Sequence, residues 1–322
     1  MPMTMREFTE LRDYRGTNPC PCDFDAFWDA RVAEAAEVPL DFTLAAGAVP
    51  DWPGCLYRDL WFTGMGGARL HAKYIRPAGD GPFPLALQFH GYPGSSRSWL
   101  ELSSFAGMGF AVVSMDCPGQ GGPGQDLGGY EGTTVTGHIV AGLDGDPKDM
   151  YYVRLYQDIC ILCRVVCELP EVDRDRIVVN GASQGGAQGI ACAALMPGLI
   201  RKAAILYPFL SDYQKVLELG ADEIAYEGLR YYSRWFDPEH KNTERWFTQL
   251  GYIDTHNFAH RVRCPVLFGT GLSDTVCPPV TQMAVYNELA CPKKLLVFPD
   301  FTHEEIQAFD DALINYFCRE GS

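Results

Sequence analysis

Ser183 lies in the pentapeptide GASQG (residues 181–185), directly after the apolar run RIVVN and directly before the helix-forming run AQGIACAAL. This is the G-x-S-x-G pattern, in which a sharp strand-to-helix turn presents a nucleophilic serine. The glycines permit the close chain approach that such a turn needs, and a helix N-terminus favours negative charge developing beside the serine. The alternative is a glycine-rich turn whose serine only caps the helix.

Two further side chains could complete a serine–histidine–aspartate set. Asp274 follows the apolar run VLFGTG in a loop, and His303 comes after LLVFPD, just before the last helical stretch. A histidine can take the serine proton as a general base, and a carboxylate can fix the tautomer of that histidine. Asp300 competes for the carboxylate role, but its place three residues before the histidine favours a structural role.

Backbone N–H groups must stabilise the oxyanion that forms in such a reaction. One donor is expected from Gln184, the residue after the nucleophile, and the second from the loop QFHGYPGSS, where we select Tyr92. We also expect Tyr92, Pro208 and Val276 to narrow the pocket for the acyl group, which would favour acetyl over longer chains.

Four other histidines and the cysteines are expected to have structural or surface roles rather than catalytic ones. His90 is expected to shape the turn after its strand, His138 lies in a long insertion, and His256 and His260 are expected at the surface or in the core. Cys20 and Cys22 lack two further ligands at metal-binding spacing, so we expect no metal. Three further cysteines share one helical face with apolar residues, typical of a buried stripe: Cys160, Cys163 and Cys167.

The elements that must position these residues begin with two strand-like runs over residues 55–77 around a turn at 64–67, which predict an antiparallel hairpin at a sheet edge. A helix is expected over residues 24–37. From residue 84 onward, short apolar runs alternate with helical stretches, which predicts a doubly wound, mostly parallel sheet. Ligands bind such sheets at the carboxyl ends of the strands, where the three side chains fall. Their order, Ser then Asp then His, is that of the α/β-hydrolase fold.

We expect a single α/β-hydrolase domain over residues 1–322, with two departures from the strand–helix rhythm. Residues 119–149 form a glycine-rich connection too long for an ordinary loop, so packing, a partner subunit or a site must hold it. Residues 210–258 form a helical excursion that we expect to lie over the active site like a lid.

Composition narrows the class of partner. The 322 residues are 47% apolar and carry a formal charge of −15, which disfavours nucleic acid and anionic membranes. The N-terminus is polar and no apolar run could span a bilayer. The twelve cysteines in such a chain are expected as reduced thiols. We therefore expect a cytoplasmic protein.

The chain resembles the acetyl xylan esterase and cephalosporin C deacetylase family, carbohydrate esterase family seven, over nearly its whole length. The motifs that carry the resemblance are HGYPGSS, GASQGG, TVTGHIVAG, YPFLSD, GLSDTVCPP and the pair His303–Glu304. It implies removal of acetyl groups from acetylated xylo-oligosaccharides and cephalosporin C, without metal or cofactor. It places the triad on the same three residues, the oxyanion donors on Tyr92 and Gln184, and implies a homo-hexamer in which the 119–149 insertion is an interface element.

One position departs from the family pattern. The family has Arg-Gly-Gln where this chain has Pro118, Gly119 and Gln120, so a rigid ring replaces a guanidinium with its fork of donors. The departure bears on the pocket wall and substrate range rather than on the nucleophile. Three alternatives stay open: a general carboxylesterase, a peptidase of the prolyl oligopeptidase type, although the chain shows no propeller segment, and a non-catalytic relative that kept the fold.

Overall fold

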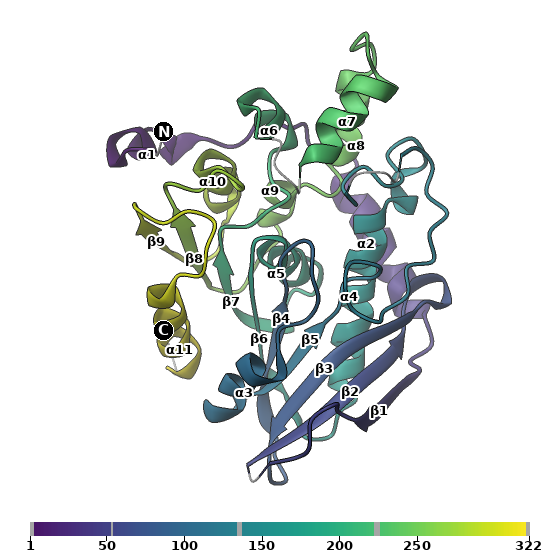
Figure 1. Ribbon diagram of the computed structural model, residues 1–322, viewed down its shortest axis with the longest axis vertical. Helices are drawn as coiled ribbons and strands as arrows, with labels where there is room; N and C mark the ends of the chain where they lie inside the picture. The colour runs from purple at the N-terminus through teal and green to yellow at the C-terminus, as the bar shows by residue number, and fades with distance from the viewer. Residues whose placement is uncertain (1–2, 53, 134–136, 222–225, 320–322) are drawn as a thin grey trace.

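The computed structural model describes residues 3–52, 54–133, 137–221 and 226–319. Within them, the strands form one sheet in the order β1-β2-β3-β5-β4-β6-β7-β8-β9 (Figure 1). The pairs β1–β2, β2–β3 and β3–β5 are antiparallel, and the strands from β5 across to β9 are parallel. The strand bounds are β1 Phe42–Ala46, β2 Cys55–Thr63, β3 Arg69–Pro77, β4 Phe83–Phe89, β5 Ala111–Met115, β6 Val172–Ala182, β7 Ile200–Leu206, β8 Val266–Gly271 and β9 Lys293–Phe298.

The predicted antiparallel hairpin is confirmed as β2 and β3, but it does not form the sheet edge, because β1 pairs with the outer side of β2. The hairpin turn contains Gly66 and Gly67 at φ 65° and 86°, a left-handed conformation that glycine adopts without a steric penalty. The parallel strands β4, β5, β7 and β8 are buried along most of their length, and β6 is buried over Ile177, Val178 and Val179. This burial explains why these strands read as continuous apolar runs rather than alternating ones. The predicted mostly parallel α/β sheet is therefore confirmed.

Helices cover both faces of the sheet, as strand alternation requires. On β6, Val179 packs into the core that includes α2, α4 and α5, while Val178 packs into the core that includes α3 and α11. The predicted helix over residues 24–37 is α2. The helix bounds are α1 Met5–Glu10, α2 Phe24–Glu37, α3 Trp99–Gly107, α4 Tyr151–Cys167, α5 Gln184–Leu195, α10 Pro279–Glu288 and α11 Gln307–Cys318.

The helical excursion is present as α6 Tyr213–Leu219, α7 Glu227–Phe236, α8 Thr243–Leu250 and α9 Thr255–Ala259. Figure 1 shows these helices at the end of the molecule toward which β7 and β8 point. The 119–149 insertion is largely irregular apart from a short 3-10 turn at Pro147–Asp149, and residues 134–136 lie outside the described ranges. None of the helices within the described ranges has both the length and the hydropathy of a membrane-spanning segment.

Candidate active site

Ser183 sits on the turn between β6 and α5 with φ 58° and ψ −124°, a conformation that residues with a side chain rarely adopt. Close chain packing enforces it. A Cβ at Gly185 would lie 2.1 Å from the carbonyl oxygen of Phe89, and one at Gly181 would lie 2.2 Å from the carbonyl oxygen of Gly185. Both glycines of the pentapeptide are therefore required by the space available, which explains the G-x-S-x-G spacing.

His303 lies between the serine and the aspartate. Its Nε2 is 3.0 Å from Ser183 Oγ and its Nδ1 is 2.9 Å from Asp274 Oδ2. Asp274 lies in the loop after β8 and His303 in the loop after β9, so adjacent parallel strands place both side chains at the same edge of the sheet. The structure thus brings together all three side chains selected from the sequence, and Asp300, the competing carboxylate, is exposed.

The Asp274 carboxylate is held by backbone donors. Its Oδ1 accepts hydrogen bonds from the N–H groups of Val276 at 2.9 Å and Cys277 at 2.8 Å. Its side chain is fully buried, so these two bonds hold the carboxylate in one orientation, with Oδ2 directed at His303. Such an arrangement fixes Nδ1 as the protonated nitrogen and leaves Nε2 free to accept the serine proton.

Two neighbours that the sequence reasoning missed enclose the triad. The Tyr207 ring lies 4.6 Å from the His303 ring, and its hydroxyl donates to the carbonyl oxygen of Glu304 at 2.8 Å. The Cys277 thiol is buried beside Ser183, and burial raises its pKa well above the usual range, so the thiol stays protonated. The motif GLSDTVCPP contained Cys277, but nothing in its spacing indicated a contact with the serine.

The expected oxyanion donors border the serine. Gln184 is the first residue of α5, so its N–H has no preceding helical carbonyl to bond. A Cβ at Gly91 would lie 3.8 Å from Ser183 Cβ, which brings the loop of Tyr92 beside the nucleophile. The two N–H groups therefore come from segments that meet at Ser183.

A buried hydrogen-bond network holds the Gln184 side chain. Its carboxamide pairs reciprocally with that of Gln120, with both N···O distances 2.9 Å, and accepts the Tyr152 hydroxyl at 2.7 Å. Gln120 also donates to the Tyr151 hydroxyl at 3.1 Å, which in turn donates to the carbonyl oxygen of Pro118 at 2.8 Å. The proline that replaces the family arginine thus supports this network through its backbone oxygen. Sequence reasoning noted Gln120 only as a neighbour of that proline.

The residues expected to narrow the acyl pocket lie on three separate segments. Pro208 is buried against the start of α5, where a Cβ at Gly186 would meet its Cα at 3.1 Å. Tyr92 is half-buried and stacks on Phe209 with ring centroids 6.3 Å apart, while Val276 is half-buried in the Asp274 loop. His138 of the insertion reaches this region, with its Nδ1 3.3 Å from the Tyr92 hydroxyl.

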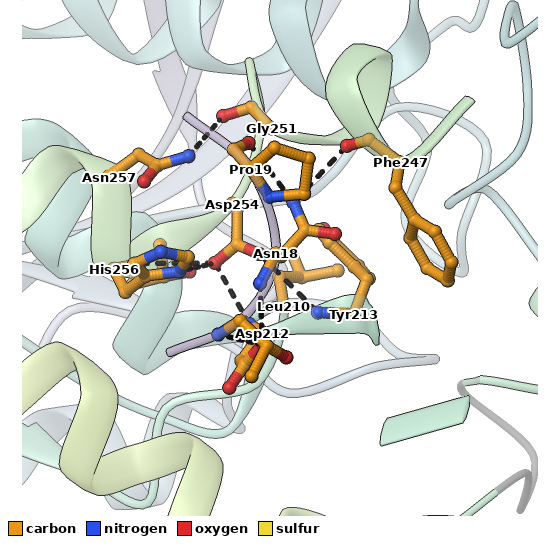
Figure 2. Close-up of polar contacts among 12 residues, drawn as sticks. Asn18, Pro19, Leu210, Asp212, Tyr213, Phe247, Gly251, Asp254, His256 and Asn257 are labelled. Atoms are coloured by element: carbon orange, nitrogen blue, oxygen red, sulfur yellow. Dashed lines mark hydrogen bonds and ion pairs between the residues drawn. The ribbon is translucent and has the colours of Figure 1, made fainter. Parts of the chain in front are cut away.

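The loop after Pro208 is fastened by a buried carboxylate cluster (Figure 2). Asp212 accepts hydrogen bonds from the backbone N–H groups of Thr17 and Asn18, both at 3.0 Å, and from the Tyr14 hydroxyl at 2.5 Å. The N–H of Asp212 itself donates to Asp254 Oδ1 at 2.9 Å. The N-terminal segment is therefore tied to the loop that leads from β7 past the nucleophile.

His256 extends the same cluster, since its Nδ1 lies 2.6 Å from Asp254 Oδ1. Burial alone would lower the pKa of His256, but the charge of Asp254 and its hydrogen bond outweigh burial and raise that pKa. His256 is therefore a buried, hydrogen-bonded core residue, which is one of the two environments expected for it. His90 shapes its turn as expected, with Nδ1 2.8 Å from the carbonyl oxygen of Gly91 and Nε2 accepting the N–H of Cys117 at 3.0 Å. His260 is exposed beside Asp25.

The cysteines differ in their burial, and one of them belongs to a cluster of possible metal ligands. Cys20 and Cys22 are exposed. Of the predicted buried stripe on α4, Cys160 and Cys163 are buried, whereas Cys167 is half-buried near the end of the helix. Across the described part of the chain, one group of three side chains has metal-ligand atoms within 4.8 Å of one another, namely Asp274, Cys277 and His303. Two of the three already bond each other in the triad.

A nucleophile elbow after β6, an aspartate after β8 and a histidine after β9, on a mostly parallel sheet, define the α/β-hydrolase class. The family model of acetyl xylan esterase (AXE1) matches residues 1–320, so the chain belongs to that family.

Individual relatives agree with this placement. The structure of acetyl xylan esterase 1 from Thermoanaerobacterium sp. JW/SL YS485 is 42% identical, with 99% of each chain covered and a TM-score of 0.94. That of an acetyl xylan esterase from Paenibacillus sp. R4 is 32% identical, with 98% of this chain and 99% of that chain covered and a TM-score of 0.91. Acetyl esterase Axe7A of Xylanibacter ruminicola is 30% identical over 88% of this chain, which spans 63% of that curated relative's length.

Proposed function

We propose that the protein is a serine esterase that removes acetyl groups from small acetylated carbohydrates through an acyl-enzyme. The observation that carries the proposal is His303 bridging Ser183 Oγ at 3.0 Å and Asp274 at 2.9 Å. Membership of the acetyl xylan esterase family supports acetyl esters as the substrate class. No cofactor takes part in this proposal.

Each step of the proposed reaction is assigned to a group at the site. His303 Nε2 takes the proton of Ser183 as Oγ attacks the acetyl carbonyl, and the N–H groups of Tyr92 and Gln184 stabilise the oxyanion. The same nitrogen then returns the proton to the leaving alcohol oxygen, which breaks the ester bond and leaves acetyl-Ser183. Water, deprotonated by His303, releases acetate and restores the serine.

The test is the release of acetate from acetylated xylo-oligosaccharides by the wild type, Ser183→Ala and Ser233→Ala. Ser233 lies on α7 and provides the matched serine control. We expect release by the wild type and by Ser233→Ala, and a loss of about 10⁴-fold or more in Ser183→Ala. Equal release by the Ser183→Ala variant would overturn the proposal. Hydrolysis of peptide amides in place of esters would favour the peptidase alternative.

The acyl range is part of the same proposal. Tyr92, Pro208 and Val276 are proposed to leave room for acetyl but not for long chains. Rates on nitrophenyl acetate, butyrate and octanoate should fall in that order, and a preference for octanoate would contradict the assignment. Cephalosporin C is proposed as a further acetyl ester for this site, to be tested with the same Ser183→Ala control.

A homo-hexamer and a cytoplasmic location are also proposed. Leu127 in the 119–149 insertion and Trp235 on α7 are large apolar residues with 54% and 60% of their surface exposed, which fits contact with other copies. The twelve cysteines are all free thiols, which fits a reducing compartment. Light scattering on the purified chain measures the mass directly, and a monomer would contradict the hexamer.

A further inference from the structure

A groove of about 460 Å³ lies on the face of the sheet between α3 and α11. Its floor is formed by β4, β6 and β7, and it lies on the opposite side of β6 from α5. This volume is within the range of pockets that hold small organic ligands.

The groove exists because the floor carries small and polar side chains where aliphatic ones would fill the space. Gln88, Asn180 and Ala204 are register partners on neighbouring strands and form one row across the floor. Ala182 lies on the same face, two residues further along β6. Alanine leaves the space that a leucine or isoleucine would occupy, and the two carboxamides place polar atoms at the bottom of it.

The two carboxamides differ in their bonding. Gln88 is satisfied, because its Oε1 accepts the Ser114 hydroxyl at 2.6 Å and its Nε2 donates to the carbonyl oxygen of Phe89 at 2.9 Å. Asn180 Oδ1 is buried without a hydrogen-bond partner. A buried carbonyl oxygen left unpaired is unfavourable, so a group that pairs with it would bind favourably.

The side walls and the opening of the groove restrict the polarity and the charge of the rest of such a ligand. Leu102 and Phe105 of α3 face Phe309 and Leu313 of α11 across the groove, so its sides are apolar. At the mouth, Arg97 is paired with both Glu101 and Glu305, at 3.2 Å and 2.8 Å. Asp310 adds a further negative charge to the lining. Three carboxylates therefore outnumber the single guanidinium, and an anionic ligand is disfavoured.

We propose that this groove binds a neutral carboxamide that carries an aromatic or aliphatic body, with its amide paired to the Asn180 side chain and its body between α3 and α11. A carboxamide has N–H donors that can pair with the unpaired Oδ1 of Asn180, and a carbonyl oxygen that can accept from Nδ2 of the same side chain. The proposed site is separate from the triad, yet it adjoins the triad from behind. Ala182 of the floor precedes Ser183, and Tyr207 of the lining packs its ring on His303.

The test measures binding of benzamide to the full chain by ligand-observed NMR and calorimetry, beside benzoate and toluene. Benzamide has the predicted amide and body, benzoate adds a negative charge, and toluene lacks polar atoms. We expect a dissociation constant on the order of 1 mM for benzamide, as suits nine heavy atoms, and at least about tenfold weaker binding of the other two. Equal binding of benzoate or toluene, or no benzamide binding at 10-fold that concentration, would overturn the proposal.

Variants then locate the site. Asn180→Leu should weaken benzamide binding about tenfold, the effect of losing two neutral hydrogen bonds. Gln307→Leu, which removes an exposed carboxamide of α11 outside the groove lining, should bind benzamide as the wild type does. Ala204→Leu fills the hollow beside Asn180 while keeping the asparagine, and it should also weaken binding, which keeps the test decisive if Asn180→Leu does not fold. Unchanged affinity in a folded Asn180→Leu or Ala204→Leu variant would overturn the assignment, as would benzamide located elsewhere in a soaked crystal.

Discussion

His303 and His256 each hold a buried aspartate through Nδ1, at 2.9 Å and 2.6 Å. The difference lies at the other ring nitrogen. His303 Nε2 faces the Ser183 hydroxyl, whereas His256 Nε2 faces the backbone of Gly16, where an added Cβ would come within 3.1 Å. His303 also keeps 21% of its side-chain surface exposed, against 7% for His256. A histidine–aspartate pair is therefore suited to proton transfer at His303, and to holding segments of the chain together at His256.

The two aspartates differ in the same way. Asp274 is bonded within its own loop, by the N–H groups of Val276 and Cys277. Asp254 instead joins distant segments, because it accepts from Asp212, which holds residues 14–18. The Asp274 carboxylate is fixed by its own loop, while the second cluster joins segments that are distant along the chain. Variants in the two regions should therefore affect different measurements.

The largest expected effect is on activity. His303→Ala should lower kcat/KM for nitrophenyl acetate by about 10⁴-fold or more, because the serine loses its general base. The urea midpoint should change little, since the ring is partly exposed. Circular dichroism serves as the folding control, and a variant that unfolds or keeps its activity would remove the distinction between the two pairs.

His256→Leu should show the reverse behaviour. Removing the ring leaves the Asp254 carboxylate buried without its counter-charge, which should lower the free energy of unfolding by about 3 kcal/mol. Urea denaturation measures this loss. Activity per folded molecule should stay within about threefold, and a loss comparable to that of His303→Ala would mean that the cluster takes part in catalysis.

Tyr14→Phe tests the attachment of the N-terminal segment. It removes one hydrogen bond to the charged Asp212 and should lower the free energy of unfolding by about 2 kcal/mol. Tyr252→Phe, which removes an exposed bond to Asp23, is the matched control and should cost less. Equal losses of unfolding free energy in the two variants would show that the burial of the Asp212 cluster does not strengthen its hydrogen bond to Tyr14.

The smallest effect concerns pH. The folded-state pKa of His256 is raised above its unfolded value near 6.5, so its stabilising contribution is fully present below pH 6.5 and is lost as pH rises through the folded pKa. The loss amounts to about 1.4 kcal/mol for each unit by which the pKa is raised. The stability difference between the wild type and a His256→Gln, Asp254→Asn double variant should be larger at pH 5.5 than at pH 8.5. A difference independent of pH would contradict a charged His256.

The sequence predicted the parts of the molecule that are specified locally. The elbow requires glycine at 181 and 185 because of contacts with the immediately packed strand and helix, so its spacing was readable. Asp274 and His303 lie in the loops after their strands, and the parallel sheet aligns those ends. The resemblance pointed to the same residues.

The Asp212 cluster could not be predicted from local sequence patterns. It joins Tyr14 and Asn18 to Asp212, positions 198 and 194 residues away along the chain. No local pattern marks a carboxylate whose partners come from so far. The Gln120–Gln184 pair was missed for the same reason, since an amide's partner depends on packing rather than on spacing.

The strained backbone at Ser183 bears on selection for heat resistance. Its φ of 58° with ψ of −124° is a conformation that glycine adopts freely, and holding a serine there costs about 1–3 kcal/mol. A screen that rewards survival on heating and ignores turnover would therefore favour glycine at position 183. Such a screen would discard the nucleophile early, so directed evolution of this chain has to select for hydrolysis in every round.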